Sequence, residues 1–308
     1  MTEHLDLNDA AISAIWREHH RHLIDVAYRM LGSVSDAEDV VQEAFTRLLR
    51  SDRESINDVR GWLVVVVSRL CLDHLRSARI RREAYVGPWL PEPVVAGGDG
   101  LAPDDRITLD DSVRMALLLV LERLTPGERV AFILHDVFQY SFDDIGRIMH
   151  KTPAACRQLA SRARRHVQDE DVNLRGAIDP VEARRVADRF IAAANTGNMH
   201  ALLEVLDPEA AGWTDSGGLV PAPRNRIVGR QRVVDRLLRF LDTFRVTLEP
   251  MPVNAAPGAI ARQDGEIIAA LTFEFSDGVI KAIHSVANPE KLTHVKAALS
   301  QPRQAARQ

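Results

Sequence analysis

Cysteines, long apolar runs and metal-ligand spacings are all scarce in this chain of 308 residues. The two cysteines, Cys71 and Cys156, lie far apart inside helix-like segments, which favours reduced, buried thiols over a disulfide framework. The sequence has no apolar stretch of about 18 residues, so we expect no transmembrane helix. It begins MTEHLDLNDA, which is acidic where a secretory signal would be basic and then apolar. These absences predict a cytoplasmic protein that does not bind membranes.

Metal and cofactor sites are not expected either. The one tight group of candidate ligands is His19, His20 and His22, which adjoin on a predicted helix and which we expect to be solvated surface. The chain is 46% hydrophobic and 27% charged with a formal net charge of −4, as in ordinary folded proteins. Its length exceeds one typical core and predicts two or three domains.

The order of helical and strand-like segments predicts several domains. Residues 9–82 read as helices, residues 83–108 contain four prolines and four glycines and read as a linker, and residues 109–170 return to a helical period. Two further helical stretches follow. Beyond them, alternating β-branched and apolar residues predict strands in RVTLEPMPV, EIIAALTFEF and GVIKAIHSV. The pattern is all-α, linker, all-α, then α+β.

Positive charge is concentrated in the segment KTPAACRQLASRARRHV, residues 151–167, which has four arginines and no acid. Thr152 followed by Pro153 is a helix start signal. A period of about 100° per residue puts one apolar face inward and leaves a polar face outward. The upstream segment SFDDIGRIM also has helical spacing, and three residues join the two. This is the pattern of a helix-turn-helix, whose second helix enters a major groove. A solvated basic face on a structural helix is the alternative.

A capped helix before this pair, with Thr125, Pro126 and Glu128 as a capping box, favours the nucleic-acid interpretation. Near the N-terminus, SDAEDVVQEAFTRLL carries a second predicted capping box, Ser35 with Glu38. One interpretation of its exposed acids is that they stabilise the helix, through favourable negative charge at the helix N-terminus and a Glu43–Arg47 pair. The other interpretation is that they contact a partner. The following segment, RGWLVVVVSRLCLDHLRSARIRR, fits a long helix with a basic end better than it fits a strand.

Two of these stretches carry a family resemblance. "AYRMLGSVSDAEDVVQEAFTRLL" with "WLVVVVSRLCLDHLRSARIRR" resembles region 2 of bacterial sigma factors of the extracytoplasmic function (ECF) type, and "LTPGERVAFILHDVFQYSFDDIGRIMHKTPAACRQLASRARRHV" resembles their region 4. The matches cover about half of the chain in the family's order. The resemblance implies a sigma factor that binds core RNA polymerase, through its β and β′ subunits, and directs promoter-specific transcription initiation without catalytic residues of its own.

The resemblance also implies roles for particular residues. Core polymerase would bind Asp36, Asp39, Gln42 and Glu43. Melted −10 DNA would bind the loop Ser51–Asp58 and the long helix, through Arg60, Trp62, Arg69, Arg76, Arg79 and Arg82, although Trp62 also suits a core position. Double-stranded −35 DNA would bind Lys151, Thr152, Ala154, Ala155, Arg157, Gln158, Ser161, Arg162 and Arg165. No anti-sigma factor can be identified from the sequence.

The C-terminal third extends beyond a typical ECF sigma factor. Residues 181–300 resemble a SnoaL-like domain, a cone of curved sheet over helices, and "WLPEP" and "NPEKL" resemble the ECF group that carries this extension. The group implies regulation in cis through Trp89, Leu90, Pro91, Asp215, Asn288, Pro289 and Lys291. The expected domains are 1–84 (region 2), 85–108 (linker), 109–172 (region 4), 180–300 (SnoaL-like) and a tail, 301–308.

Two alternatives remain open at this point. The chain could be a helix-turn-helix regulator fused to a ligand-binding or catalytic SnoaL-like domain. In the catalytic version Asp215 and His284, in candidate strands near Trp213 and Phe273, would act as acid or base. A ligand-sensing or purely packed cavity is favoured over catalysis, and we expect no enzyme activity.

Overall fold

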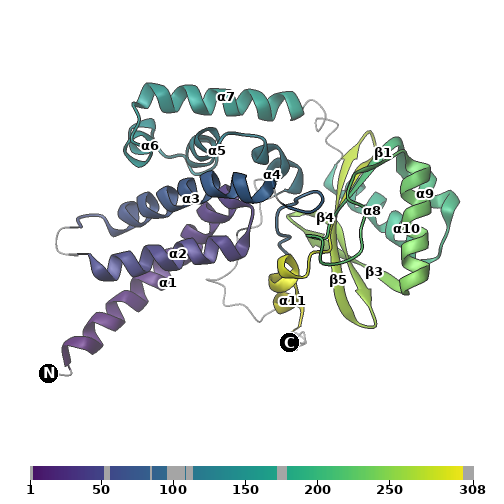
Figure 1. Ribbon diagram of the computed structural model, residues 1–308, viewed down its shortest axis with the longest axis horizontal. Coiled ribbons are helices and arrows are strands. Elements are labelled where there is room, and N and C mark those ends of the chain that lie inside the picture. Colours follow the sequence, from purple (N-terminus) through teal and green to yellow (C-terminus); the bar gives the residue numbers. More distant parts are fainter. Residues whose placement is uncertain are drawn as a thin grey trace. The chain divides into compact units, whose positions relative to one another are not determined.

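The computed structural model describes residues 3–51, 56–83, 85–95, 108, 114–171 and 179–300 (Figure 1). Only the backbone is described for residues 3–11, 78–83 and 169–171. The described residues form two compact units, within residues 1–81, 101–108 and 121–166, and within residues 82–100, 109–120 and 167–308. Across the described ranges, no helix combines the length and the apolar character needed to cross a membrane.

The first unit begins with three long helices, α1 (Glu3–Leu31), α2 (Val34–Arg50) and α3 (Val59–Glu83). The Val64–Val67 run is therefore helical, as expected. The predicted cap of α2 at Ser35 was wrong. The chain reverses at Gly32, which has a φ of +69°, and the helix starts two residues earlier. The Ser33 hydroxyl then accepts a hydrogen bond from the Asp36 N–H at 3.1 Å.

The N-terminal histidines are not solvated surface, so that expectation was wrong. His20 is 8% exposed and stacks on Trp16 with ring centroids 4.1 Å apart. His22 is half-buried, and its Nε2 lies 3.1 Å from the Tyr140 hydroxyl. Burial, assisted by the positive charge of Arg60, lowers the pKa of His22. The buried face of α1 is wide enough to include these imidazole rings. The prediction treated histidine as a polar surface residue and therefore did not anticipate this burial.

The second half of this unit contains the helix-turn-helix. The helices are α4 (Met115–Glu122, whose last two residues belong to this unit), α5 (Pro126–Phe132), a π-helical turn η4 (Ile133–Val137), α6 (Phe142–Met149) and α7 (Pro153–Asp171). The capping box of Thr125 and Glu128 is confirmed. Three residues join α6 to α7, as expected, and His150 turns the chain with a φ of +52°.

Gly146 explains why this turn can be so tight. A Cβ at Gly146 would lie 2.7 Å from the Lys151 carbonyl oxygen, closer than real contacts allow. The side of α7 that faces inward carries Cys156, Ala160 and Ala163, all buried, as the helical period predicts. Cys71 in α3 and Cys156 are free, buried thiols, which confirms the expectation drawn from their spacing.

The second unit contains an α+β domain. Its elements are α8 (Pro180–Asn195), α9 (Met199–Val205), β1 (Leu206–Asp215), β2 (Ile227–Val228), α10 (Arg230–Phe244), β3 (Val246–Val253), β4 (Ala256–Gln263), β5 (Glu266–Ser276), β6 (Val279–Val286), a 3-10 turn η5 (Glu290–Leu292) and α11 (Thr293–Leu299). The strand order is β2-β1-β6-β5-β4-β3. β1 pairs with β6 in parallel, and the other pairings are antiparallel.

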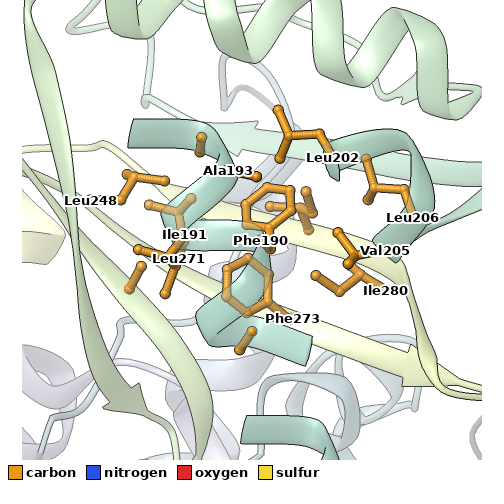
Figure 2. Close-up of a cluster of buried hydrophobic side chains, with 14 of the residues drawn as sticks. Phe190, Ile191, Ala193, Leu202, Val205, Leu206, Leu248, Leu271, Phe273 and Ile280 are labelled. Carbon is orange, nitrogen blue, oxygen red and sulfur yellow. The ribbon is translucent and has the colours of Figure 1, made fainter. Parts of the chain in front are cut away.

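Helices α8, α9 and α10 cover one face of this sheet (Figure 1). Phe190 of α8 meets Phe273 of β5 with ring centroids 5.1 Å apart, at the centre of the core drawn in Figure 2. Leu202 and Val205 of α9 close the same cluster. The expected α+β fold is thus confirmed.

Part of the proline-rich segment belongs to this unit too. The Asn254 N–H donates to the Val94 carbonyl at 2.7 Å, and Val95 forms an isolated bridge with Val253. Leu90 is buried with Met115 and Val286. Residues 85–95 are therefore packed against the sheet through specific bonds, while residues 96–107 lie outside the described part of the chain.

Candidate functional site

One exposed face of α7 gathers most of the residues expected to contact −35 DNA. Six of them line a single shallow hollow on the surface: Ala154, Arg157, Gln158, Ser161, Arg162 and Arg165. All six are exposed. Helical spacing places them together, because residues three and four apart lie on the same side of a helix.

The remaining three expected residues lie at the start of α7. Lys151 is exposed, and the Thr152 hydroxyl accepts a hydrogen bond from the Ala155 N–H at 3.2 Å, which caps the helix. The guanidinium of Arg157 lies 5.2 Å from the ring centre of Phe142 in α6. That contact orients Arg157 while leaving it accessible. The fourth arginine of the segment, Arg164, instead forms an ion pair with Asp136 at 2.6 Å.

The expected polymerase-binding residues lie along α2. Asp39 and Gln42 are exposed. Glu43 is paired with Arg47 at 2.8 Å, as anticipated, and remains 46% exposed. Asp36 is turned towards α3, where its carboxylate lies 3.2 Å from His74 Nε2. The most accessible part of the acidic face is therefore Asp39, Gln42 and Glu43.

The residues expected to contact −10 DNA are more dispersed. Arg60 is exposed and Trp62 is half-buried at the first turns of α3. Arg76 is exposed and paired with Asp73 at 3.1 Å. The side chains of Arg79 and Arg82, and residues 52–55 of the preceding loop, lie outside the described part of the structure.

Arg69 has a different environment from the other basic residues of α3. Its Nε donates to the Ile148 carbonyl at 3.0 Å and its Nη2 to the Arg147 carbonyl at 2.9 Å. Both acceptors lie at the C-terminus of α6, where helix carbonyls are unsatisfied and the helix dipole is negative. In this conformation Arg69 therefore joins α3 to the helix-turn-helix.

The residues expected to be regulatory meet around Asp215, at the end of β1. The carboxylate is fully buried and accepts hydrogen bonds from Tyr85 Oη at 2.5 Å, the Leu90 N–H at 2.8 Å and Lys291 Nζ at 2.7 Å. The Asp215 carbonyl accepts from the N–H groups of Ala287 and Asn288. We call the set Tyr85, Leu90, Asp215, Asn288 and Lys291 the Asp215 cluster.

Lys291 is the cation of this cluster. Its ammonium also donates to the Leu90 carbonyl at 2.5 Å and lies 4.1 Å from the ring centre of Trp89. A buried ammonium with carboxylate, carbonyl and aromatic partners is well compensated. Pro91 is buried beside these residues, whereas Pro289 is exposed at the start of η5. The structure thus brings together most of the residues named from the two motifs.

Tyr85 was missed by sequence reasoning. Its hydroxyl donates to Asp215 and accepts a hydrogen bond from Asn288 Nδ2 at 3.0 Å. Burial, and next the Asp215 carboxylate, raise the pKa of Tyr85, so the hydroxyl remains protonated and able to donate. The one available signal was an aromatic residue four positions before the WLPEP motif.

Asp215 and His284 do not form a catalytic pair. Asp215 is occupied by the cluster, and His284 Nε2 lies 2.8 Å from Glu274 Oε1 while its ring stacks on Trp213. The domain has a cavity between α10 and the sheet, and neither Asp215 nor His284 lines it. The hypothesis that these two side chains act in the cavity is therefore wrong.

Comparison with known proteins identifies the family. Residues 15–81 match the model of Sigma-70 region 2, and residues 114–167 match the model of Sigma-70 region 4. The probable ECF RNA polymerase sigma factor SigI of Mycobacterium tuberculosis is 41% identical over 295 residues, which cover 94% of this chain and 97% of that protein. The chain belongs to the ECF RNA polymerase sigma factors. Members of this family direct transcription initiation, and this chain is a sigma factor of that kind.

Similarity extends through the C-terminal domain of this sigma factor. The ECF RNA polymerase sigma factor SigJ of M. tuberculosis is 38% identical over 286 residues, covering 89% of this chain and 90% of that protein. The crystal structure of SigJ matches this one with a TM-score of 0.74 at 35% identity, covering 92% of this chain and 98% of that chain. The architecture of regions 2 and 4 followed by an α+β domain is therefore shared.

Replacing Asp215 by Asn should destabilise the second unit of this sigma factor. The change leaves the Lys291 ammonium buried without its counter-charge, which costs about 3–5 kcal/mol in comparable pairs. The measurement is urea unfolding of the full chain followed by circular dichroism. Asp277→Asn, in an exposed turn, is the control and should change little. Adding Lys291→Met to Asp215→Asn should restore part of the lost free energy of unfolding. If the effects of the two substitutions on this free energy were simply additive, the coupling between the two side chains would be contradicted.

Proposed function

We propose that this sigma factor binds core RNA polymerase through α2, melted −10 DNA through α3 and the loop before it, and −35 DNA through α7. The observation that carries the proposal is the exposed face of α7, with three arginines and two hydrogen-bonding side chains around one hollow. We further propose that its C-terminal domain modulates this activity in cis. The functional boundaries would be 1–84, 85–108, 109–172 and 180–300.

The chemistry of the α7 face suits duplex DNA. Ala154 is small and exposed near the N-terminus of the helix, so backbone and side chains can approach a major groove closely. Gln158 can pair with adenine, and Arg157 or Arg165 with guanine, each through two parallel hydrogen bonds. Arg162 and Lys151, on the flanks, suit phosphate contacts.

The −10 role of Arg69 requires a rearrangement. Its guanidinium is satisfied by the two carbonyls at the end of α6, and a single-stranded DNA phosphate would have to replace them. Arg60 is exposed and needs no such release, and Arg76 is exposed in an ion pair with Asp73 on its own helix. We therefore propose that the described packing of α3 on α6 is a state before promoter binding, and that Arg69 becomes available when regions 2 and 4 separate.

The case for regulation in cis rests on the Asp215 cluster. Residues 85–91 of the segment between regions 2 and 4 are held on the α+β domain by a buried ion pair and several hydrogen bonds. A domain that holds this segment restricts how far regions 2 and 4 can move apart. Promoter binding at two separated elements depends on that freedom, so the domain can alter initiation without touching DNA.

We propose that the α+β domain is not an enzyme and that the protein acts in the cytoplasm. The cavity lining includes no aspartate, glutamate or histidine among the described residues, and these side chains are the commonest general acids and bases in enzymes. Transcription takes place where the polymerase is, and the described helices offer no membrane span.

Changing Arg157, Gln158 or Arg165 to Ala should weaken binding of a −35 duplex by roughly tenfold each, because a paired side chain discriminates by about 1–3 kcal/mol. The duplex is chosen by run-off transcription of a promoter library with core polymerase, and affinity is then measured by fluorescence anisotropy. Arg184→Ala, an exposed arginine of α8, is the matched control. Unchanged affinity at moderate salt would remove the assignment of α7.

Reversing charge at Asp39 and Glu43, each to Lys, should weaken association with core RNA polymerase by about tenfold or more, since like charges would face each other in the complex. Holoenzyme formation with labelled sigma factor measures the effect. The control is Asp188→Lys in α8, because Asp188 is an exposed acid with an arginine four residues away, as Glu43 is. Normal assembly of the Asp39→Lys, Glu43→Lys protein would refute the docking face.

Removing the α+β domain, by truncation after about residue 170, should change the amount of run-off transcript from a fixed promoter. In the full chain, Tyr85→Phe removes one hydroxyl from the Asp215 cluster and should shift transcription in the same direction by a smaller factor. Ser276→Ala, a hydroxyl outside the cluster in the same domain, is the control. Equal transcript levels from truncated and full-length protein would count against regulation in cis.

A further inference from the structure

The α+β domain contains a cavity of about 330 Å³ between α10 and the sheet. This volume falls within the range of small-molecule sites, at its lower end. The walls are mainly apolar and come from α10 and from strands β1, β4, β5 and β6. The cavity borders the packed cluster of Figure 2: Leu248 and Leu271 belong to both, whereas the rings of Phe190 and Phe273 do not line the cavity. The domain therefore contains an apolar cavity next to a well-packed hydrophobic core.

The mouth of the cavity exposes large aromatic side chains. Phe240 and Phe244 are 36% and 45% exposed, and both line the cavity one helical turn apart on α10. The loop Val220–Pro223 borders the same opening. Exposed aromatic rings next to an apolar cavity provide contact area for an apolar ligand that enters it.

The charge of the lining selects the ligand's head group. Arg236 is the one charged side chain among the described lining residues. It is exposed on α10 and makes no ion pair within the described part of the chain. Thr214, Gln263 and Ser285 add uncharged hydrogen-bonding groups. A guanidinium at the edge of an apolar cavity fits a carboxylate, which it can bind with two parallel hydrogen bonds.

We propose that this cavity binds a small apolar molecule that carries one carboxylate, such as a medium-chain or aromatic acid. The apolar body fills the space between α10 and the sheet, and the carboxylate meets Arg236. The proposal concerns binding alone and does not depend on the promoter or polymerase assignments.

The cavity shares its wall with the Asp215 cluster. Successive side chains of a strand point to opposite faces of a sheet. In β1, Thr214 lines the cavity and Asp215 is next in sequence; after β6, Ala287 lines the cavity and Asn288 is next. A ligand against one face therefore lies one residue from the groups that hold residues 85–91 on the other. We expect a bound ligand to change how firmly the Leu90 N–H is held by Asp215. An effect of the ligand on transcription would rest, in addition, on the proposed regulation in cis.

Isothermal titration of the full-length protein with decanoate and with 1-naphthoate tests the binding site, with 1-decanol as the uncharged match. We expect at least one acid to bind more tightly than the alcohol. Arg236→Gln should weaken binding of that acid by about tenfold, as expected for loss of a charge-assisted pair. Arg232→Gln, exposed on the same helix but outside the lining, should leave it unchanged.

Ser285→Leu places a larger side chain in the cavity from the sheet and should abolish binding of the acid. Circular dichroism checks that the Ser285→Leu protein folds. If that variant does not fold, Arg236→Gln remains the test of the site. Absence of binding by either acid up to its solubility limit would overturn the proposal. Equal affinity for acid and alcohol, or insensitivity to Arg236→Gln, would overturn the carboxylate assignment. Hydrogen exchange of the Leu90 N–H, which donates to Asp215, reports coupling directly. Exchange unaltered by a bound acid would refute the coupling while leaving the binding result intact.

Discussion

The buried ion pair of Asp215 and Lys291 is the interaction on which the arrangement of the second unit depends. A carboxylate with no exposed surface costs far more than ordinary packing can repay unless every lone pair has a partner. Lys291 supplies the counter-charge, but a single ammonium leaves further acceptor positions empty. The Tyr85 hydroxyl and the Leu90 N–H fill them. The segment that begins at residue 85 is therefore held on the domain because the buried carboxylate of Asp215 needs its hydrogen-bond donors. Apolar contacts of Leu90 add to this stabilisation.

The same pair explains local features of the loop after β1. Gly217 donates its N–H to Asp215 and has a φ of +59°, a conformation that other residues adopt with strain. A Cβ there would lie 2.6 Å from Asn288 Nδ2. Because Asn288 must reach Tyr85, the backbone of the loop has to come this close. The requirement for glycine thus follows from the hydrogen bonds around the buried carboxylate.

The sequence was sufficient to predict the buried and exposed faces of a helix where apolar and polar residues are fully separated around that helix. In α7 the buried alanines and the exposed arginines alternate with the helical period, so both faces followed from spacing alone. The histidines of α1 misled because polar residues with aromatic rings can be buried by stacking, as His20 is on Trp16. Strand β4 was missed because APGAIARQ lacks apolar alternation, whereas β1 was anticipated only as a candidate strand around Trp213 and Asp215. Tyr85 was not named because it lies outside the WLPEP motif, whereas Leu90, inside the motif, was named although both residues bond to the distant Asp215.

The pairing of β1 with β6 is what lets the Asp215 cluster exist. In the described sheet this is the parallel pairing, with Trp213 opposite His284 and Asp215 opposite Val286. Parallel neighbours end at the same edge of a sheet, whereas antiparallel neighbours end at opposite edges. Asp215 at the end of β1 therefore meets Asn288 and Lys291, which follow the end of β6. An antiparallel β1 would carry the carboxylate a strand length away, and the segment around Leu90 would have no charged anchor.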